Sequence, residues 1–108
     1  MSNYSTNIYQ ILKAIDLSYE NQDFNAETTL DLEKLEISQH RLDLILENLS
    51  NDGYLTGITV VKFIGGSGIK FNNPKLTTQG ILFLENNSNM KKAYSTLKEM
   101  RGWIPGFS

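Results

Sequence analysis

The segment ISQHRLDLILENLSNDGYL, residues 37–55, constrains the fold of this chain more than any other stretch. Its apolar side chains recur at i, i+3, i+4 and i+7, the stripe of a helix that lies on a core. They are Leu42, Ile45, Leu46 and Leu49. Ser38 is a good N-cap, and Gly53 stands where a left-handed residue closes the last turn without a Cβ clash. The sequence therefore predicts a helix from Gln39 to Asn51.

A β-hairpin is predicted directly after this helix, in GYLTGITVVKFIGGSGIKF, residues 53–71. β-branched and aromatic residues alternate on both sides of a glycine-rich tip at residues 65–68. The cross-strand pairs expected from that tip are Ile64–Ile69, Phe63–Lys70 and Lys62–Phe71. Gly57 is a candidate bulge position. Residues 72–74, Asn-Asn-Pro, are expected to end the second strand because proline gives the ladder no donor.

Helices are predicted on both sides of these elements. The first spans Thr6 to Tyr19, with Ser5 or Thr6 as cap. Its apolar positions are Ile8, Ile11, Leu12, Ile15 and Tyr19. A polar connection follows, in which Phe24 is expected to anchor the loop to the core. TLDLEKLEI, residues 29–37, then predicts a short helix capped by Thr28 or Thr29, with Leu32 and Leu35 on one face.

Two more helices are predicted after the hairpin. LTTQGILFLENN, residues 76–87, has Thr77 as cap, and its inward residues are expected to be Ile81, Leu82 and Leu84. The last helix is expected from Met90 to Arg101, followed by Trp103, Ile104 and Phe107.

The order of these elements is typical of a winged helix-turn-helix. We expect an α+β fold, with a two- or three-stranded antiparallel wing sheet and extra C-terminal helices. The length of 108 residues predicts a single domain, residues 1–108. A generic α+β domain is the alternative.

Three segments give the chain a resemblance to a known family. They are LENLSNDGYLTG (residues 46–57), PKLTTQGILFLENN (74–87) and MKKAYSTLKEMRGWI (90–104). The chain resembles the YjcQ family of small proteins from Gram-positive bacteria and their prophages, from about Asn7 to Ile104. The resemblance implies a winged-helix fold and no established activity.

Composition argues against several classes of protein. Cysteine is absent, which excludes disulfides and thiolate zinc sites. No run approaches the length of a membrane span, and the start is not that of a signal peptide, so a soluble, cytoplasmic protein is expected. His40 is the only histidine, and no serine lies in a GxSxG elbow. We therefore expect no enzyme, no metal site and no cofactor.

Double-stranded DNA is the first candidate partner, bound weakly. In a winged helix the third helix enters the major groove and the wing touches the backbone. The candidate DNA-binding residues are Lys62, Lys70 and Lys75 on or near the wing, and Gln39, Arg41 and Asn48 on the third helix. Asp43 and Glu47 oppose this reading because they repel phosphates.

A protein partner or a homodimer is the second candidate. Residues 1–52 carry ten acidic and three basic side chains, a net charge of −7, whereas residues 53–108 carry two acidic and seven basic ones, a net charge of +5. Such asymmetry indicates either an interaction surface or two halves that complement each other. Leu44 on the acidic helix and Trp103 and Phe107 in the tail are candidate interface residues, with the C-terminal helix as a dimer contact. A phage accessory role belongs to this alternative.

Overall fold

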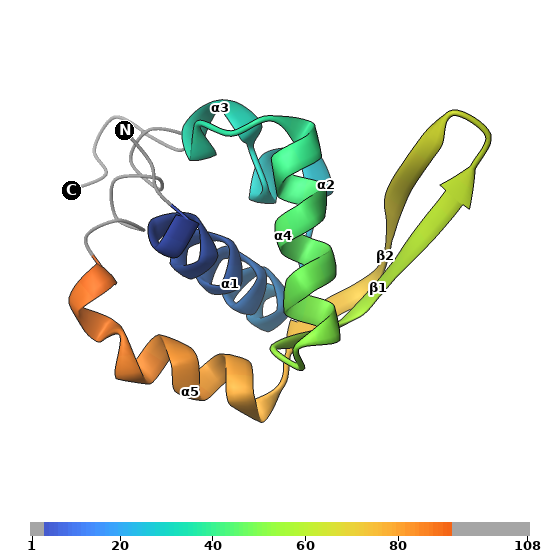
Figure 1. Cartoon of the computed structure of the whole chain (residues 1–108). Coiled ribbons are helices and arrows are strands. Elements are labelled where there is room, and N and C mark those ends of the chain that lie inside the picture. The colour runs from blue at the N-terminus through green and yellow to red at the C-terminus, as the bar shows by residue number, and fades with distance from the viewer. Residues whose placement is uncertain (1–3, 92–108) are drawn as a thin grey trace.

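The computed structural model describes residues 4–91 as a mixed α+β fold (Figure 1). The elements in order are α1 (Tyr4–Asn21), α2 (Ala26–Thr29), α3 (Leu32–Leu35), α4 (Gln39–Asn51), β1 (Leu55–Phe63), β2 (Gly66–Leu76), α5 (Thr78–Asn86) and a 3-10 turn (Ser88–Met90). The two strands form one antiparallel sheet. The predicted helix from Met90 to Arg101 lies almost wholly outside the described residues. None of the described helices is long and apolar enough to cross a membrane.

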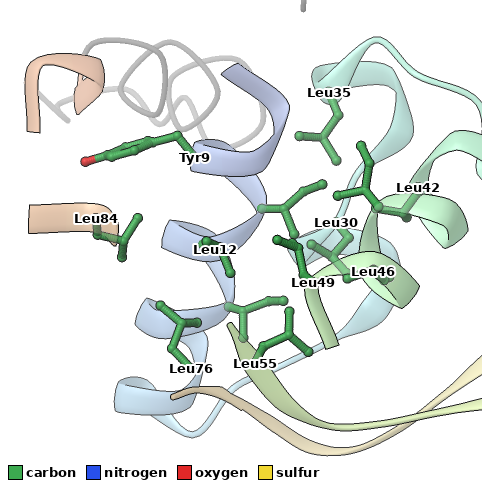
Figure 2. Packing of buried hydrophobic residues seen from close by; sticks show 13 residues of the cluster. Tyr9, Leu12, Leu30, Leu35, Leu42, Leu46, Leu49, Leu55, Leu76 and Leu84 are labelled. Atoms are coloured by element: carbon green, nitrogen blue, oxygen red, sulfur yellow. The ribbon is translucent and has the colours of Figure 1, made fainter. Parts of the chain in front are cut away.

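The core lies around α1, with α4 on one side and α5 on another (Figure 1). Figure 2 shows the apolar side chains of these helices meeting Leu55 and Leu76 at the base of the hairpin. All four predicted residues of the α4 stripe are buried: Leu42, Ile45, Leu46 and Leu49. The bounds of α4 and its Ser38 cap, whose side chain accepts from the Arg41 amide, are also confirmed.

Helix α1 is longer than predicted, and its inward face differs at both ends. Ile11, Leu12 and Ile15 are fully buried as predicted. Tyr19 is instead 40% exposed, and Tyr9, which the apolar spacing did not select, is buried. Burial raises the pKa of the Tyr9 hydroxyl because desolvation disfavours the phenolate. The buried Asn7 amide donates to the Leu35 carbonyl (3.1 Å) and so joins α1 to α3.

The short helix predicted within residues 29–37 is present as α3, but a second four-residue helix, α2, precedes it and was not predicted. Asn25 caps α2 by accepting from the amides of Glu27 and Thr28, and Asp31 caps α3 in the same way. Neither predicted cap, Thr28 or Thr29, serves as one. Phe24 does anchor the connection, since its ring lies 5.0 Å from that of Phe71.

The hairpin is present, but the predicted register is wrong. Phe63 pairs with Gly66, and the turn consists of Ile64 and Gly65 alone. Gly65 has a φ of 95°, which supplies the left-handed residue that a tight turn needs. The glycines at positions 66 and 68 therefore belong to β2. The correct pairs are Lys62–Ser67, Val60–Ile69, Thr59–Lys70 and Ile58–Phe71.

The bulge predicted at Gly57 is confirmed, and it explains why β2 continues past Pro74. The register shifts between Thr56 and Ile58, because residues 72–74 stand opposite Gly57 alone. Pro74 lies within this bulge, where its missing donor costs no ladder hydrogen bond. The prediction that residues 72–74 end the strand is therefore wrong, and β2 extends to Leu76.

Helix α5 is attached to the end of α4. The Thr77 hydroxyl accepts from the Gly80 amide (3.2 Å), as predicted for a cap, and donates to the Gly53 carbonyl (2.5 Å). Gly80 and Leu84 face inward, and a Cβ at Gly80 would overlap the Tyr54 carbonyl oxygen. This contact turns the helix so that Ile81 and Leu82 are exposed, which contradicts their predicted burial.

Candidate interaction site between helix α4 and the hairpin

The site follows from the way in which α4 and the hairpin lie beside each other. Because the stripe from Leu42 to Leu49 faces the core, the opposite stripe of α4 faces outward. Four residues of that stripe line a hollow whose other side is the hairpin: His40, Asp43, Leu44 and Glu47. The hairpin contributes residues 65–69. A second hollow lies between the hairpin and α2, α3 and α4, and it shares Asp43 and residues 67–69 with the first. We call the two hollows together the acidic groove.

Carboxylates from three helices line the acidic groove. They are Glu27 on α2, Asp31 and Glu33 at the start of α3, and Asp43 and Glu47 on α4. No lysine or arginine is among the described residues that line it. Leu30, Leu32 and Leu42 form its apolar part on the helix side, and Ile69 and Phe71 on the hairpin side. The groove therefore combines an apolar floor with negative charge.

The three predicted base-reading residues of α4 all have partners within the chain. The Gln39 amide donates to the Asp43 carboxylate at 2.8 Å. The Arg41 guanidinium lies 6.0 Å from the centre of the Tyr4 ring, and the Asn48 amide donates to the Tyr4 hydroxyl at 3.3 Å. Arg41 and Asn48 therefore lie on the flank of α4 that faces α1. Gln39 alone of the three lines the acidic groove.

The structure does not bring the three hairpin lysines to one face. Residues paired directly across two strands lie on the same side of a sheet, and successive residues alternate. Lys62 shares the inner face with its partner Ser67 and with Ile69 and Phe71, which pack toward the core. Lys70 and its partner Thr59 lie on the outer face. Lys75 follows the bulge and pairs with Thr56, and its Nζ is 5.7 Å from the centre of the Tyr19 ring.

Apolar side chains are exposed at this end of the molecule. Leu44 is 41% exposed, which agrees with its predicted outward position. Phe63 is 60% exposed and Ile64 is fully exposed at the hairpin tip. The other two candidate interface residues, Trp103 and Phe107, lie outside the described residues.

The sequence did not predict that α2 and α3 contribute to this site. Glu27 and Glu33 belong to first turns whose caps were not predicted, so their position facing the hairpin could not be deduced. The sequence signal for this site was the net negative charge of residues 1–52, which indicated an interaction surface but not its position. His40 is exposed, as expected for a histidine on the outer face. Among residues 4–91, no three acidic or imidazole groups converge as metal ligands would.

Comparison with known proteins confirms the resemblance found in the sequence. The family model described as "YjcQ protein" matches residues 9–103. The chain is similar to the Bacillus subtilis (strain 168) protein described as "Uncharacterized protein YjcQ", with 28% identity over 96 residues, which cover 89% of this chain and 92% of that protein. No solved structure shows a significant match to the chain. Because the family model spans most of its length, the chain belongs to the YjcQ family.

Proposed function

We propose that this chain is a winged-helix module that acts by binding another protein at the acidic groove, without catalysis. The order of α1, the α2–α3 pair, α4 and the hairpin supports the winged-helix assignment. In that assignment α4 is the third helix and the hairpin is the wing. The partner is argued from the site, because one fold hosts many functions.

One observation carries the choice of a protein over DNA. The stripe of α4 that faces the hairpin contains Asp43 and Glu47, and the described lining of the groove includes no lysine or arginine. A duplex placed in the usual way would bring its phosphates to these carboxylates, although phosphate contacts dominate protein–DNA affinity. A protein surface with basic and apolar side chains matches the groove in both respects.

The exposed apolar residues agree with a protein partner. Phe63 and Ile64 at the hairpin tip and Leu44 in the lining of the groove offer a large apolar area to a partner. Aromatic and aliphatic anchors surrounded by polar groups are the usual composition of a protein interface. Such apolar side chains do not contribute to contacts with the charged phosphates of a DNA backbone.

Site-specific photo-crosslinking in the source cells tests this proposal. We expect a Leu44→p-benzoylphenylalanine variant to form an adduct with one protein, identifiable by mass spectrometry. The matched control places the same residue at Tyr19, which is 40% exposed against 41% for Leu44 but lies away from the groove. Adding Asp43→Lys and Glu47→Lys to the Leu44 variant is expected to reduce the adduct at least about tenfold, because like charges then face the partner.

Two results would contradict the proposal. The first is crosslinking to nucleic acid from position 44. The second is a protein adduct of equal yield from positions 44 and 19, which would show that the contact does not depend on the groove.

Weak DNA binding is a second candidate, favoured by one observation. Lys62, Lys70 and Lys75 are all exposed, so each is accessible to phosphate even though they do not share a face. We expect any binding to random duplex DNA to come from these lysines. Three phosphate contacts give a log–log salt slope of about −3.

A titration with duplex DNA at about 50 mM salt measures this second candidate. Replacing all three lysines with alanine is expected to abolish the binding. Asp43→Asn with Glu47→Gln is expected to strengthen it, because two charges that repel phosphate are lost. If the triple lysine variant binds as well as the parent, the hairpin does not carry the contact.

A further inference from the structure

We propose that the partner enters the acidic groove as an extended segment that pairs with the free edge of β2 and carries lysine or arginine at alternate positions. This inference rests on the proposed protein-binding function and names the chemistry of the partner. It follows from how β2 faces the groove, how long its free edge is and where the charges lie.

The edge of β2, rather than one of its faces, is turned toward the groove. Residues 66–69 and Phe71 of this strand line it, whereas no residue of β1 does. A sheet that turned one face to the groove would present side chains of both strands, so a lining from β2 alone indicates that the sheet is seen from the edge of β2. Among residues 4–91 the sheet has two strands, and β1 takes the other edge of β2.

The free edge is a template for one short strand. Within the described part of the chain, residues 66–71 make no backbone hydrogen bond to any segment other than β1. Unpaired N–H and C=O groups of this kind accept an added strand from a partner. The regular stretch runs for six residues, about 20 Å, and ends at the bulge of residues 72–74. A matching segment therefore has about six residues.

The charges on the two sides of the added strand differ, which predicts alternation. Side chains on its inner face would meet the carboxylates of Asp43 and Glu47, together with those of Glu27 and Glu33. Apolar groups such as Leu32 and Leu42 would cover the methylene stems of lysine or arginine. Side chains on the outer face would lie beside Lys70, where a second positive charge is unfavourable. The partner is thus expected to alternate basic residues with uncharged ones.

NMR titration of the full chain with synthetic peptides tests this inference. The probe is a capped peptide of nine residues, about three more than the edge requires, in which lysine and valine alternate. We expect it to shift the amide signals of residues 66–71 and of Asp43 and Glu47. Methylating the backbone nitrogens on one edge of the peptide should weaken binding at least about tenfold, because several strand hydrogen bonds are lost.

Matched variants test the contribution of charge to peptide binding separately from that of strand pairing. The double variant Asp43→Asn, Glu47→Gln is expected to bind the lysine–valine peptide about three- to thirtyfold more weakly. Glu85→Gln removes a carboxylate from α5, on the other side of the molecule, and should leave binding unchanged (Figure 1). A peptide with glutamate in place of lysine should not bind.

The remaining outcomes overturn the inference. Equal binding of the methylated peptide excludes strand addition, and equal binding of the glutamate peptide excludes the charge argument. If the lysine–valine peptide causes no shift at about 1 mM, the range of weak binding, the inference fails. If the Leu44 variant still crosslinks to a protein in that case, the proposed function holds and the extended-segment inference alone is wrong. If the variant does not crosslink, both are wrong.

Discussion

Replacing Leu46 with alanine is expected to lower the free energy of unfolding by about 2–5 kcal/mol. Leu46 has no exposed surface and lies where α4 meets α1 and the base of the hairpin (Figure 2). The change removes apolar atoms from the core and leaves a cavity, and both effects destabilise the fold. Urea denaturation followed by far-UV circular dichroism measures the difference.

Leu44→Ala is the matched control for this prediction, since it makes the same change two residues away on the same helix. Leu44 is 41% exposed, so its loss should change the free energy of unfolding by no more than about 0.5 kcal/mol. Equal destabilisation by the two variants would show that α4 is not oriented as described. The acidic groove would then lose its basis, because it depends on the outward stripe of this helix.

The elements best predicted from the sequence are those in which local signals agree. Helix α4 combines an N-cap at Ser38, an apolar stripe and a left-handed glycine at position 53, whose φ is 85°. Each signal alone is weak, but all three favour the same bounds. Thr77 and Gly57 were also predicted correctly, because a cap and a bulge depend on a few neighbouring residues.

The errors arise where a distant contact decides the structure. The hairpin register depends on which of several glycines forms the turn, and the sequence offered a run from Gly65 to Gly68. The orientation of α5 depends on the close approach of Gly80 to the Tyr54 carbonyl. Apolar spacing alone therefore assigned Ile81 and Leu82 to the core, although both are exposed.

The candidate site was predicted in part. The acidic character of α4 and the exposure of Leu44 could be deduced, because both depend on one helix. The separation of Lys62 from Lys70 could be deduced as well, because the predicted pairs Lys62–Phe71 and Phe63–Lys70 already place the two lysines on opposite faces. The observed pairs, Lys62–Ser67 and Thr59–Lys70, give the same result. What could not be predicted is that α2 and α3 bring Glu27 and Glu33 to the hairpin, because this depends on tertiary packing.

The second large effect is expected at Gly57, where two separate costs combine. Its φ is 87°, a conformation that is strained for alanine. A Cβ at this position would also lie 2.7 Å from the Pro74 Cα and within 2.9 Å of the carbonyl oxygens of Asn72 and Asn73. All three contacts are with backbone, which cannot move without altering the bulge. Gly57→Ala is therefore expected to lower the free energy of unfolding by about 2–5 kcal/mol.

Gly65→Ala separates these two costs. Gly65 has a similar φ of 95°, but no atom of the described residues lies within 4 Å of a Cβ built there. Its replacement should cost only the backbone strain, about 1 kcal/mol, measured by the same denaturation experiment. If the two variants are equally destabilised, the close approach of residues 72–74 to Gly57 does not contribute. A bulge bends its strand and increases the local twist, so this contact also sets how the hairpin leaves the core. A larger loss for Gly57→Ala would show that the close packing of residues 72–74 around Gly57 stabilises the bulge from which the hairpin extends.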